Sequence, residues 1–143
     1  MSTLSVSFLW HMHQPWYGSA DGQRMVLPWT RLHGLKDYLD MIAVVDEHPG
    51  LHVTFNLVPS LLAQLQQYVD GETTDDALEL SRRPAADLSL EDRLWWMNEG
   101  FKCHWPRMLQ PYPRYRELLS MRGTVGQPER LERAAARASR RDL

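Results

Sequence analysis

The stretch Leu4-Ser5-Val6-Ser7-Phe8-Leu9-Trp10-His11-Met12-His13-Gln14-Pro15-Trp16-Tyr17 decides how the rest of this sequence is interpreted. Its first part is typical of a β-strand over residues 3–13, in which side chains point alternately to opposite faces. Pro15 cannot continue a central strand, so the strand should end before it. His11 and His13 then share one face, roughly 6.6 Å apart along the strand, at its carboxyl end. A polar and aromatic strand end of this kind is expected at the floor of a hydrated pocket.

The next elements alternate between helix and strand. Apolar residues at three-four spacing predict a helix over residues 30–47 with Thr30 as its N-cap, and period-two alternation predicts a strand over residues 51–58. A second helix should follow over residues 60–69. This order predicts two neighbouring parallel strands, and sites in such folds form at the carboxyl ends of the strands. His11, His13 and Asn56 should therefore meet there. The expected buried stripe of the first helix is Leu32, Leu35, Leu39 and Ile42, and that of the second is Leu61, Leu65 and Tyr68.

The second half of the chain is expected to be mainly helical. One short helix is predicted near residues 76–81, Ser89 is the predicted N-cap of a longer helix, and a further short helix is predicted over residues 115–121. We expect residues 1–126 to form one unit and residues 127–143 to form a helical tail rich in Ala and Arg. The acidic residues of this half and of the segment before it have the pattern of solvated faces or helix-start charges rather than of a catalytic pair. They are Asp75, Asp76, Glu91 and Asp92.

Composition limits the classes of partner that this chain is expected to bind. It has 143 residues, of which 43% are hydrophobic and 24% are charged, as in globular proteins. The formal net charge of -2 argues against a nucleic-acid partner, and no apolar run approaches the roughly 18 residues of a membrane span. The single Cys103 allows no internal disulfide and, with no recognisable signal peptide, indicates a cytoplasmic location.

Several blocks of this sequence resemble a known family. The pentapeptide His11-Met12-His13-Gln14-Pro15 resembles the first signature region of glycoside hydrolase family 57. Further blocks, in the same order along the chain, resemble the amylopullulanase-like branch of that family. Together the blocks cover roughly residues 3–123. The further blocks are residues 27–33, 36–38, 53–62, 105–108 and 111–115.

The resemblance implies an α/β fold, namely the N-terminal part of an incomplete seven-stranded β/α barrel of the glycoside hydrolase/deacetylase type. It implies action on α-glucans or maltooligosaccharides with retention of configuration, which requires two carboxyl groups about 5–5.5 Å apart. In the family these are a Glu and an Asp on later strands, and neither motif is found in this sequence. We therefore expect a catalytically incomplete chain, truncated before the next barrel strand, that self-associates through exposed strand edges. We expect no catalytic residue, metal or cofactor here, and a substrate-binding set of His11, His13, Gln14, Trp16, Trp29 and Asn56.

Alternative interpretations stay open. The two histidines could be buried hydrogen-bonding groups, the two tryptophans could be packing residues, and Asn56 could cap the turn after its strand. The His-x-His pattern also fits a metal-dependent barrel hydrolase, in which two imidazoles bind Zn²⁺ with later ligands. The isolated chain could also be a non-catalytic glucan-binding domain or a non-functional truncated domain.

Overall fold

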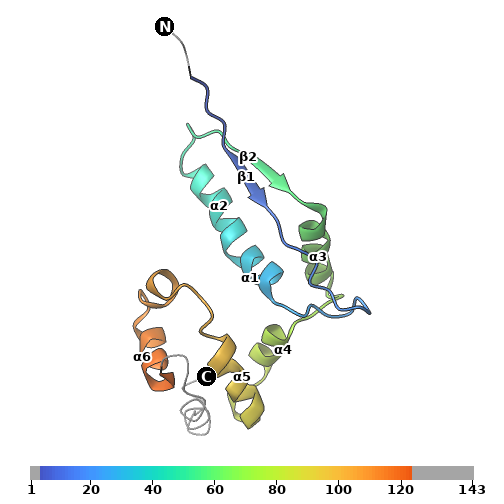
Figure 1. Cartoon of the computed structure of the whole chain (residues 1–143), viewed down its shortest axis with the longest axis vertical. Helices are drawn as coiled ribbons and strands as arrows, with labels where there is room; N and C mark the ends of the chain where they lie inside the picture. The colour runs from blue at the N-terminus through green and yellow to red at the C-terminus, as the bar shows by residue number, and fades with distance from the viewer. Residues whose placement is uncertain (1–3, 124–143) are drawn as a thin grey trace. The chain divides into compact units, whose positions relative to one another are not determined.

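Two short parallel strands form the only sheet in the part of the chain that the structure describes, residues 4–123 of a computed structural model (Figure 1). Strand β1 is Leu9–Met12 and strand β2 is Thr54–Leu57, with His11 opposite Asn56 in the register. The ladder is extended at its two ends by the Thr54 N–H donating to the Phe8 carbonyl (2.9 Å) and the Val58 N–H donating to the Met12 carbonyl (3.3 Å). The predicted parallel pair is confirmed, but both strands are shorter than predicted.

The helices of the first half follow the predicted order with one interruption. Helix α1 is Trp29–Leu35, helix α2 is Asp37–Asp46 and helix α3 is Pro59–Asp70. The prediction of one helix over residues 30–47 is wrong, because Lys36 leaves helical geometry at φ -130° and ψ -73°. Thr30 is not an N-cap: it lies inside α1 with 0% of its surface exposed, and its Oγ1 has no hydrogen-bond partner among the described residues.

The predicted buried stripe of the first helix is exposed. Its four members have between 40% and 67% of their surface accessible. Helical spacing places them on one face, but no described element of residues 4–79 covers that face. The period of the pattern therefore identifies the face without identifying a partner. The equivalent stripe of α3 is buried at Leu61 and half-buried at Leu65 and Tyr68. The exposed residues are Leu32, Leu35, Leu39 and Ile42.

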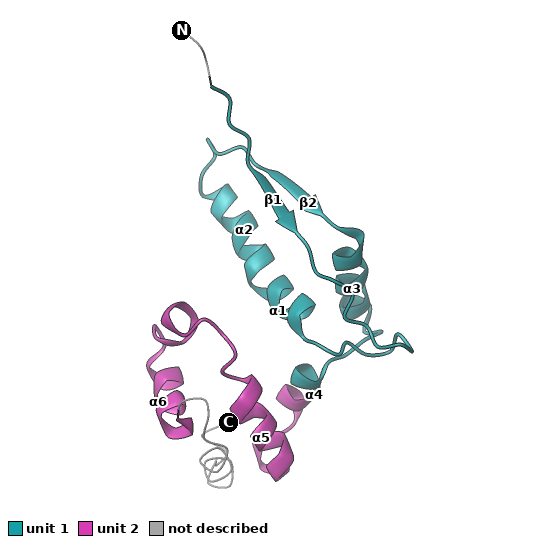
Figure 2. Ribbon diagram, viewed as in Figure 1, with its two compact units in different colours: residues 1–79 teal, residues 80–143 magenta. Residues whose placement is uncertain are grey.

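The chain divides into two compact units, residues 1–79 and residues 80–143 (Figure 2). Both strands and helices α1 to α3 belong to the first unit, and helix α4, Asp76–Arg82, crosses the boundary. The second unit contains helix α5, Leu90–Glu99, and helix α6, Pro113–Arg122, so a mixed α/β chain with a mainly helical second half is confirmed. The predicted tail over residues 127–143 lies outside the described residues. Among the described residues, no helix is long and apolar enough to cross a membrane.

Local sequence signals explain the helices of the second unit. Ser89 caps α5 as predicted: its side chain accepts from the Asp92 N–H, and the Asp92 carboxylate accepts from the Ser89 N–H (2.9 Å), which completes a capping box. Pro113 occupies the first turn of α6, where its missing N–H costs no hydrogen bond. At the other end of α6, the buried guanidinium of Arg122 lies 5.1 Å from the ring centre of Phe101.

Candidate functional site

The carboxyl ends of the two strands bring three predicted site residues together. The exposed rings of His11 and His13 contact each other through Nε2 and Nδ1, 3.3 Å apart, with their planes at 81°. Asn56, which is also exposed, is the register partner of His11 on β2. Two imidazoles and a carboxamide thus offer hydrogen-bond donors and acceptors to solvent at one end of the sheet.

Gln14, the next predicted residue, is buried, and its carboxamide contacts two tyrosines. Its Nε2 donates to the Tyr38 hydroxyl (2.9 Å), and its Oε1 accepts from the Tyr17 hydroxyl (3.1 Å). The Tyr38 hydroxyl in turn donates to the His13 carbonyl (3.3 Å). Burial raises the pKa of Tyr17, so its hydroxyl stays protonated and available as a donor at neutral pH. This small network fixes the side chain of Gln14, the residue that follows His13.

Helix α3 holds the backbone of the segment that follows. The Ser60 hydroxyl donates to the Gln14 carbonyl (2.8 Å). The carboxamide of Gln64, with 0% of its surface exposed, donates to the Pro15 carbonyl and accepts from the Tyr17 N–H, both at 2.9 Å. Sequence reasoning missed this residue. The available signal was a polar side chain three residues after Leu61, on the face of α3 that the apolar spacing marks as buried.

The two predicted tryptophans have different surroundings. Trp16 is 50% exposed, and its indole lies against Gly18 so closely that a Cβ at Gly18 would be 2.5 Å from Nε1. Trp29, at the start of α1, is half-buried, and its ring centre is 6.4 Å from that of His33. The His33 ring is 6.2 Å from the ring of Tyr38, so a row of three rings connects Trp29 to the network around Gln14.

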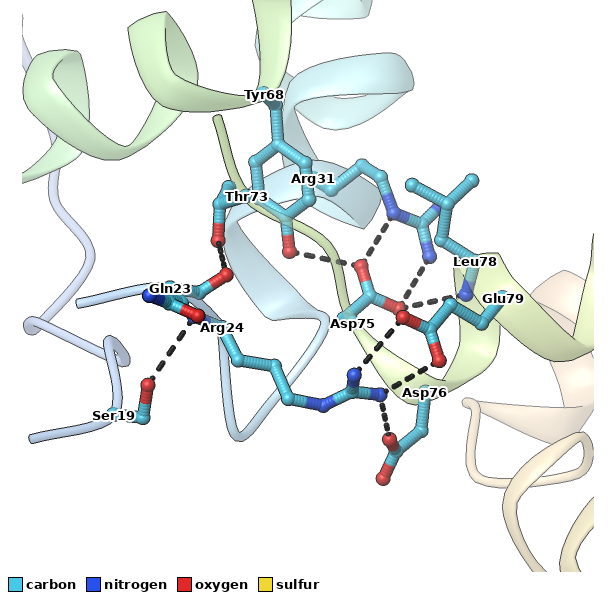
Figure 3. A network of polar contacts seen from close by, with 10 residues as sticks. All are labelled: Ser19, Gln23, Arg24, Arg31, Tyr68, Thr73, Asp75, Asp76, Leu78 and Glu79. Atoms are coloured by element: carbon cyan, nitrogen blue, oxygen red, sulfur yellow. Dashed lines mark hydrogen bonds and ion pairs between the residues drawn. The ribbon is translucent and has the colours of Figure 1, made fainter. Parts of the chain in front are cut away.

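A buried carboxylate supports the elements that carry these residues (Figure 3). Asp75 accepts from Nε and Nη2 of Arg31 in α1 (2.7 and 3.0 Å), from the Tyr68 hydroxyl in α3 (2.8 Å) and from the Leu78 N–H (2.8 Å). Burial alone would raise the pKa of Asp75, but the hydrogen bonds from Arg31, Leu78 and Tyr68 outweigh it and hold the pKa below its usual range. Of the two roles expected for Asp75, the helix-start charge is confirmed, since it directly precedes α4 and accepts from the Leu78 N–H, whereas the solvated face is not, because the side chain is buried.

A second ion cluster lies at the surface next to the first. Arg24 pairs with Asp76 and, at 2.9 Å, with Glu79, and the hydrogen bonds to these two carboxylates raise its pKa. The Met25 N–H donates to the Thr74 carbonyl (2.8 Å), so the loop after Trp16 is bound to the segment after α3. Figure 3 shows Arg24 reaching Asp76 and Glu79 from the side of the Ser19 and Gln23 loop, whereas Arg31 reaches Asp75 from the side of Tyr68. Exposed pairs of this kind contribute little individually.

Within residues 4–123, no three His, Cys, Asp or Glu side chains are grouped so that they could hold a metal ion. Asp75 is also the only buried carboxylate of that range. Because Arg31 and Tyr68 occupy its oxygens, its role in the described structure is to join α1 to α3.

Parallel strands joined through helices, with a polar and aromatic segment at their carboxyl ends, define a βαβα unit of an α/β protein. The family model described as "Glycosyl hydrolase family 57" matches residues 7–123. The chain therefore belongs to glycosyl hydrolase family 57, which supports a glycoside hydrolase-type function in carbohydrate metabolism and a carbohydrate substrate. No curated protein and no solved structure gives a significant match to the chain.

Proposed function

We propose that residues 10–17, together with Trp29 and Asn56, form part of a binding site for an α-glucan or a maltooligosaccharide. The observation that carries the proposal is the exposed His11–His13 pair beside Asn56, at the strand ends of a chain that belongs to a carbohydrate-active family. Neutral sugars are bound through hydroxyl groups and through the apolar faces of their rings. This region offers both kinds of contact.

Each side chain has a distinct proposed role. His11, His13 and Asn56 orient sugar hydroxyls through ring nitrogens and a carboxamide. Trp16 packs its exposed indole on a sugar ring, and Trp29 extends the aromatic surface along α1. Gln14, buried between its two tyrosines, completes the site from beneath and fixes the backbone that carries the second histidine.

The finer family features belong to this proposal as well. We place the chain in the amylopullulanase-like branch, as the first part of an incomplete seven-stranded barrel that retains anomeric configuration, and we place its action in the cytoplasm. Retention requires a nucleophile and an acid/base about 5–5.5 Å apart. The carboxylate of Asp75 is bound by Arg31, so we propose that residues 4–123 bind substrate without supplying this pair.

The proposal is tested by titrating the 143-residue chain with maltoheptaose in a calorimeter. His13→Ala and Trp16→Ala should each weaken binding about ten-fold, since one well-placed contact is worth about 1.4 kcal/mol. The control is His48→Ala, an exposed histidine at the end of α2 whose Nδ1 contacts the Val44 carbonyl (2.8 Å). Cellohexaose, with β-linkages, should bind more weakly than maltoheptaose. Equal binding by wild type and by both site variants would overturn the proposal.

One observation keeps the metal-hydrolase alternative testable. Two ring nitrogens 3.3 Å apart have the separation of two ligands on a tetrahedral zinc ion with bonds of about 2.0–2.1 Å. That alternative predicts stoichiometric Zn²⁺ binding that His11→Ala abolishes, and maltoheptaose binding that a chelator removes. The proposal made here predicts that a chelator leaves maltoheptaose binding unchanged.

A further inference from the structure

The carboxamide of Gln64 is the most completely used polar group at the candidate site. We infer that Gln64 is the positioning residue of this site, fixing the turn that presents His13 and Trp16; the inference rests on the proposed function. Gln64 does not itself contact the sugar, because it is fully buried. It acts through the backbone of residues 15–17.

Three hydrogen bonds define the orientation of this carboxamide. Nε2 donates to the Pro15 carbonyl and to the Ser60 carbonyl, both at 2.9 Å, and Oε1 accepts from the Tyr17 N–H at 2.9 Å. Two acceptors face the nitrogen and one donor faces the oxygen, so the network fixes which atom is which. Both Nε2 hydrogens are used.

No other natural side chain satisfies these three groups. An ionised Glu would direct negative charge at two carbonyl oxygens, and an apolar residue would remove the partner that Gln64 gives to the Pro15 carbonyl and to the Tyr17 N–H. A segment deprived of these two hydrogen bonds should move toward solvent, where water can satisfy both groups. The effect is local, because the three partners lie on one turn of the chain and on the first turn of α3.

Beyond the side-chain network of Gln14 with Tyr17 and Tyr38, the segment held by Gln64 has few other hydrogen bonds. Strand β1 ends at Met12, and the next helix begins at Trp29. In between, the described backbone contacts of residues 14–17 are those from Gln64 and Ser60 and one from the Val26 N–H to the Tyr17 carbonyl (2.9 Å). A binding segment that samples several conformations binds with an affinity reduced by the fraction that is competent. Gln64 should therefore raise affinity by keeping that fraction high.

The test compares Gln64→Met with Gln66→Met in the full chain. Met has nearly the size of Gln and removes all three hydrogen bonds, whereas Gln66 is an exposed carboxamide on the same helix that contacts only Asp70 (2.8 Å) among the described residues. Deuterium exchange of the Tyr17 amide is followed by mass spectrometry at single-residue resolution without ligand, and maltoheptaose affinity is measured separately. Gln64→Met should accelerate Tyr17 exchange at least ten-fold and weaken maltoheptaose binding about ten-fold. Gln66→Met should change neither.

Gln64→Glu adds a readout that a purely structural role would not give. A protonated carboxyl keeps one donor and one acceptor, and burial against carbonyl oxygens should raise its pKa. Lowering the pH from about 8 to about 5 should therefore bring the ratio of wild-type to variant affinity back toward one. Each pH is compared with wild type, so pH effects that are common to both proteins cancel.

Each outcome decides the inference. It is overturned if Gln64→Met leaves Tyr17 exchange at the wild-type rate, or if exchange rises equally at the helical amides of α5, which would indicate global destabilisation. If Gln64→Met does not fold, the pH dependence of Gln64→Glu decides in its place, and a ratio that does not change with pH overturns the inference. If the wild type binds no maltoheptaose, the proposed function fails, while Tyr17 exchange still reports whether Gln64 holds the segment.

Discussion

Replacing Asp75 with asparagine tests whether one buried carboxylate holds α1 and α3 together. The Asp75 side chain is 1% exposed and accepts two hydrogen bonds from Arg31, one from the Tyr68 hydroxyl and one from the Leu78 N–H. Asparagine has nearly the same shape, so the substitution removes charge and acceptor capacity without opening a cavity. Its amide oxygen can keep the contact with Leu78, but its NH₂ group faces the Arg31 guanidinium.

The expected cost follows from these contacts. A hydrogen bond to a charged group contributes about 1.5–3 kcal/mol, and breaking a buried ion pair from one side costs about 3–5 kcal/mol because the other charge is left uncompensated. Arg31 is 16% exposed, so water can solvate part of its guanidinium after the substitution. We therefore expect Asp75→Asn to lower the free energy of unfolding by about 3 kcal/mol.

Urea unfolding followed by tryptophan fluorescence measures this change. The matched control is Asp76→Asn, which removes the next carboxylate in the chain, 60% exposed and paired with Arg24 at the surface, and should cost less than about 1 kcal/mol. If the two variants unfold at the same urea concentration, the Asp75 cluster does not hold the unit together. Loss of the Arg31–Asp75 pair should also change the position of Trp29 at the candidate site, because Trp29 and Arg31 lie on the same helix.

Four further outcomes are expected. Hydrogen bonds hold the pKa of Asp75 below its unfolded value of about 3.9, so its contribution to stability is present above that pH and is lost as the pH falls through the folded pKa. When the pH is lowered below about 4, the urea midpoint of the wild type should therefore fall more than that of Asp75→Asn. Gly18→Ala should displace the Trp16 indole, changing its fluorescence and weakening maltoheptaose binding while leaving the urea midpoint almost unchanged, since this indole is half exposed. The purified chain should release no reducing sugar from starch, pullulan or maltooligosaccharides, because imidazoles cannot replace the carboxylate that forms a glycosyl-enzyme intermediate. Light scattering should detect self-association, since both strands have an unpaired edge within the described residues, and a clean monomer with a sharp thermal transition would contradict this.

The parts of the fold that depend on local sequence could be predicted. Alternation of side chains located both strands, and the Ser89–Asp92 capping box located the start of α5, because the groups concerned are at most a few residues apart. The pairing of His11 with Asn56 followed from the same reasoning, since the carboxyl ends of adjacent parallel strands must meet.

The contacts that depend on residues distant in the sequence could not be predicted. Asp75 looks like any acidic residue at a helix start until Arg31, 44 residues earlier, is placed against it. Gln64 looks like a solvated amide until the Pro15 carbonyl, 49 residues earlier, is placed beside it. For the stripe of α1 and α2 the sequence predicted a contact that the structure does not show. The spacing of Leu35 and Leu39 specifies a helix face whether or not anything packs on it.

Asp75 and Gln64, whose contacts the sequence did not predict, both depend on helix α3. Gln64 and Tyr68 are one turn apart on α3, so they lie on the same face. The first binds the segment that presents His13 and Trp16, and the second binds Asp75. Gly71 ends α3 in the left-handed conformation (φ 74°), which L side chains rarely adopt, and so turns the chain back toward Tyr68. A change that loosens α3 should therefore release the strand-end segment and helix α1 together, and substitutions along this face should weaken the proposed glucan binding even at side chains that do not contact the ligand.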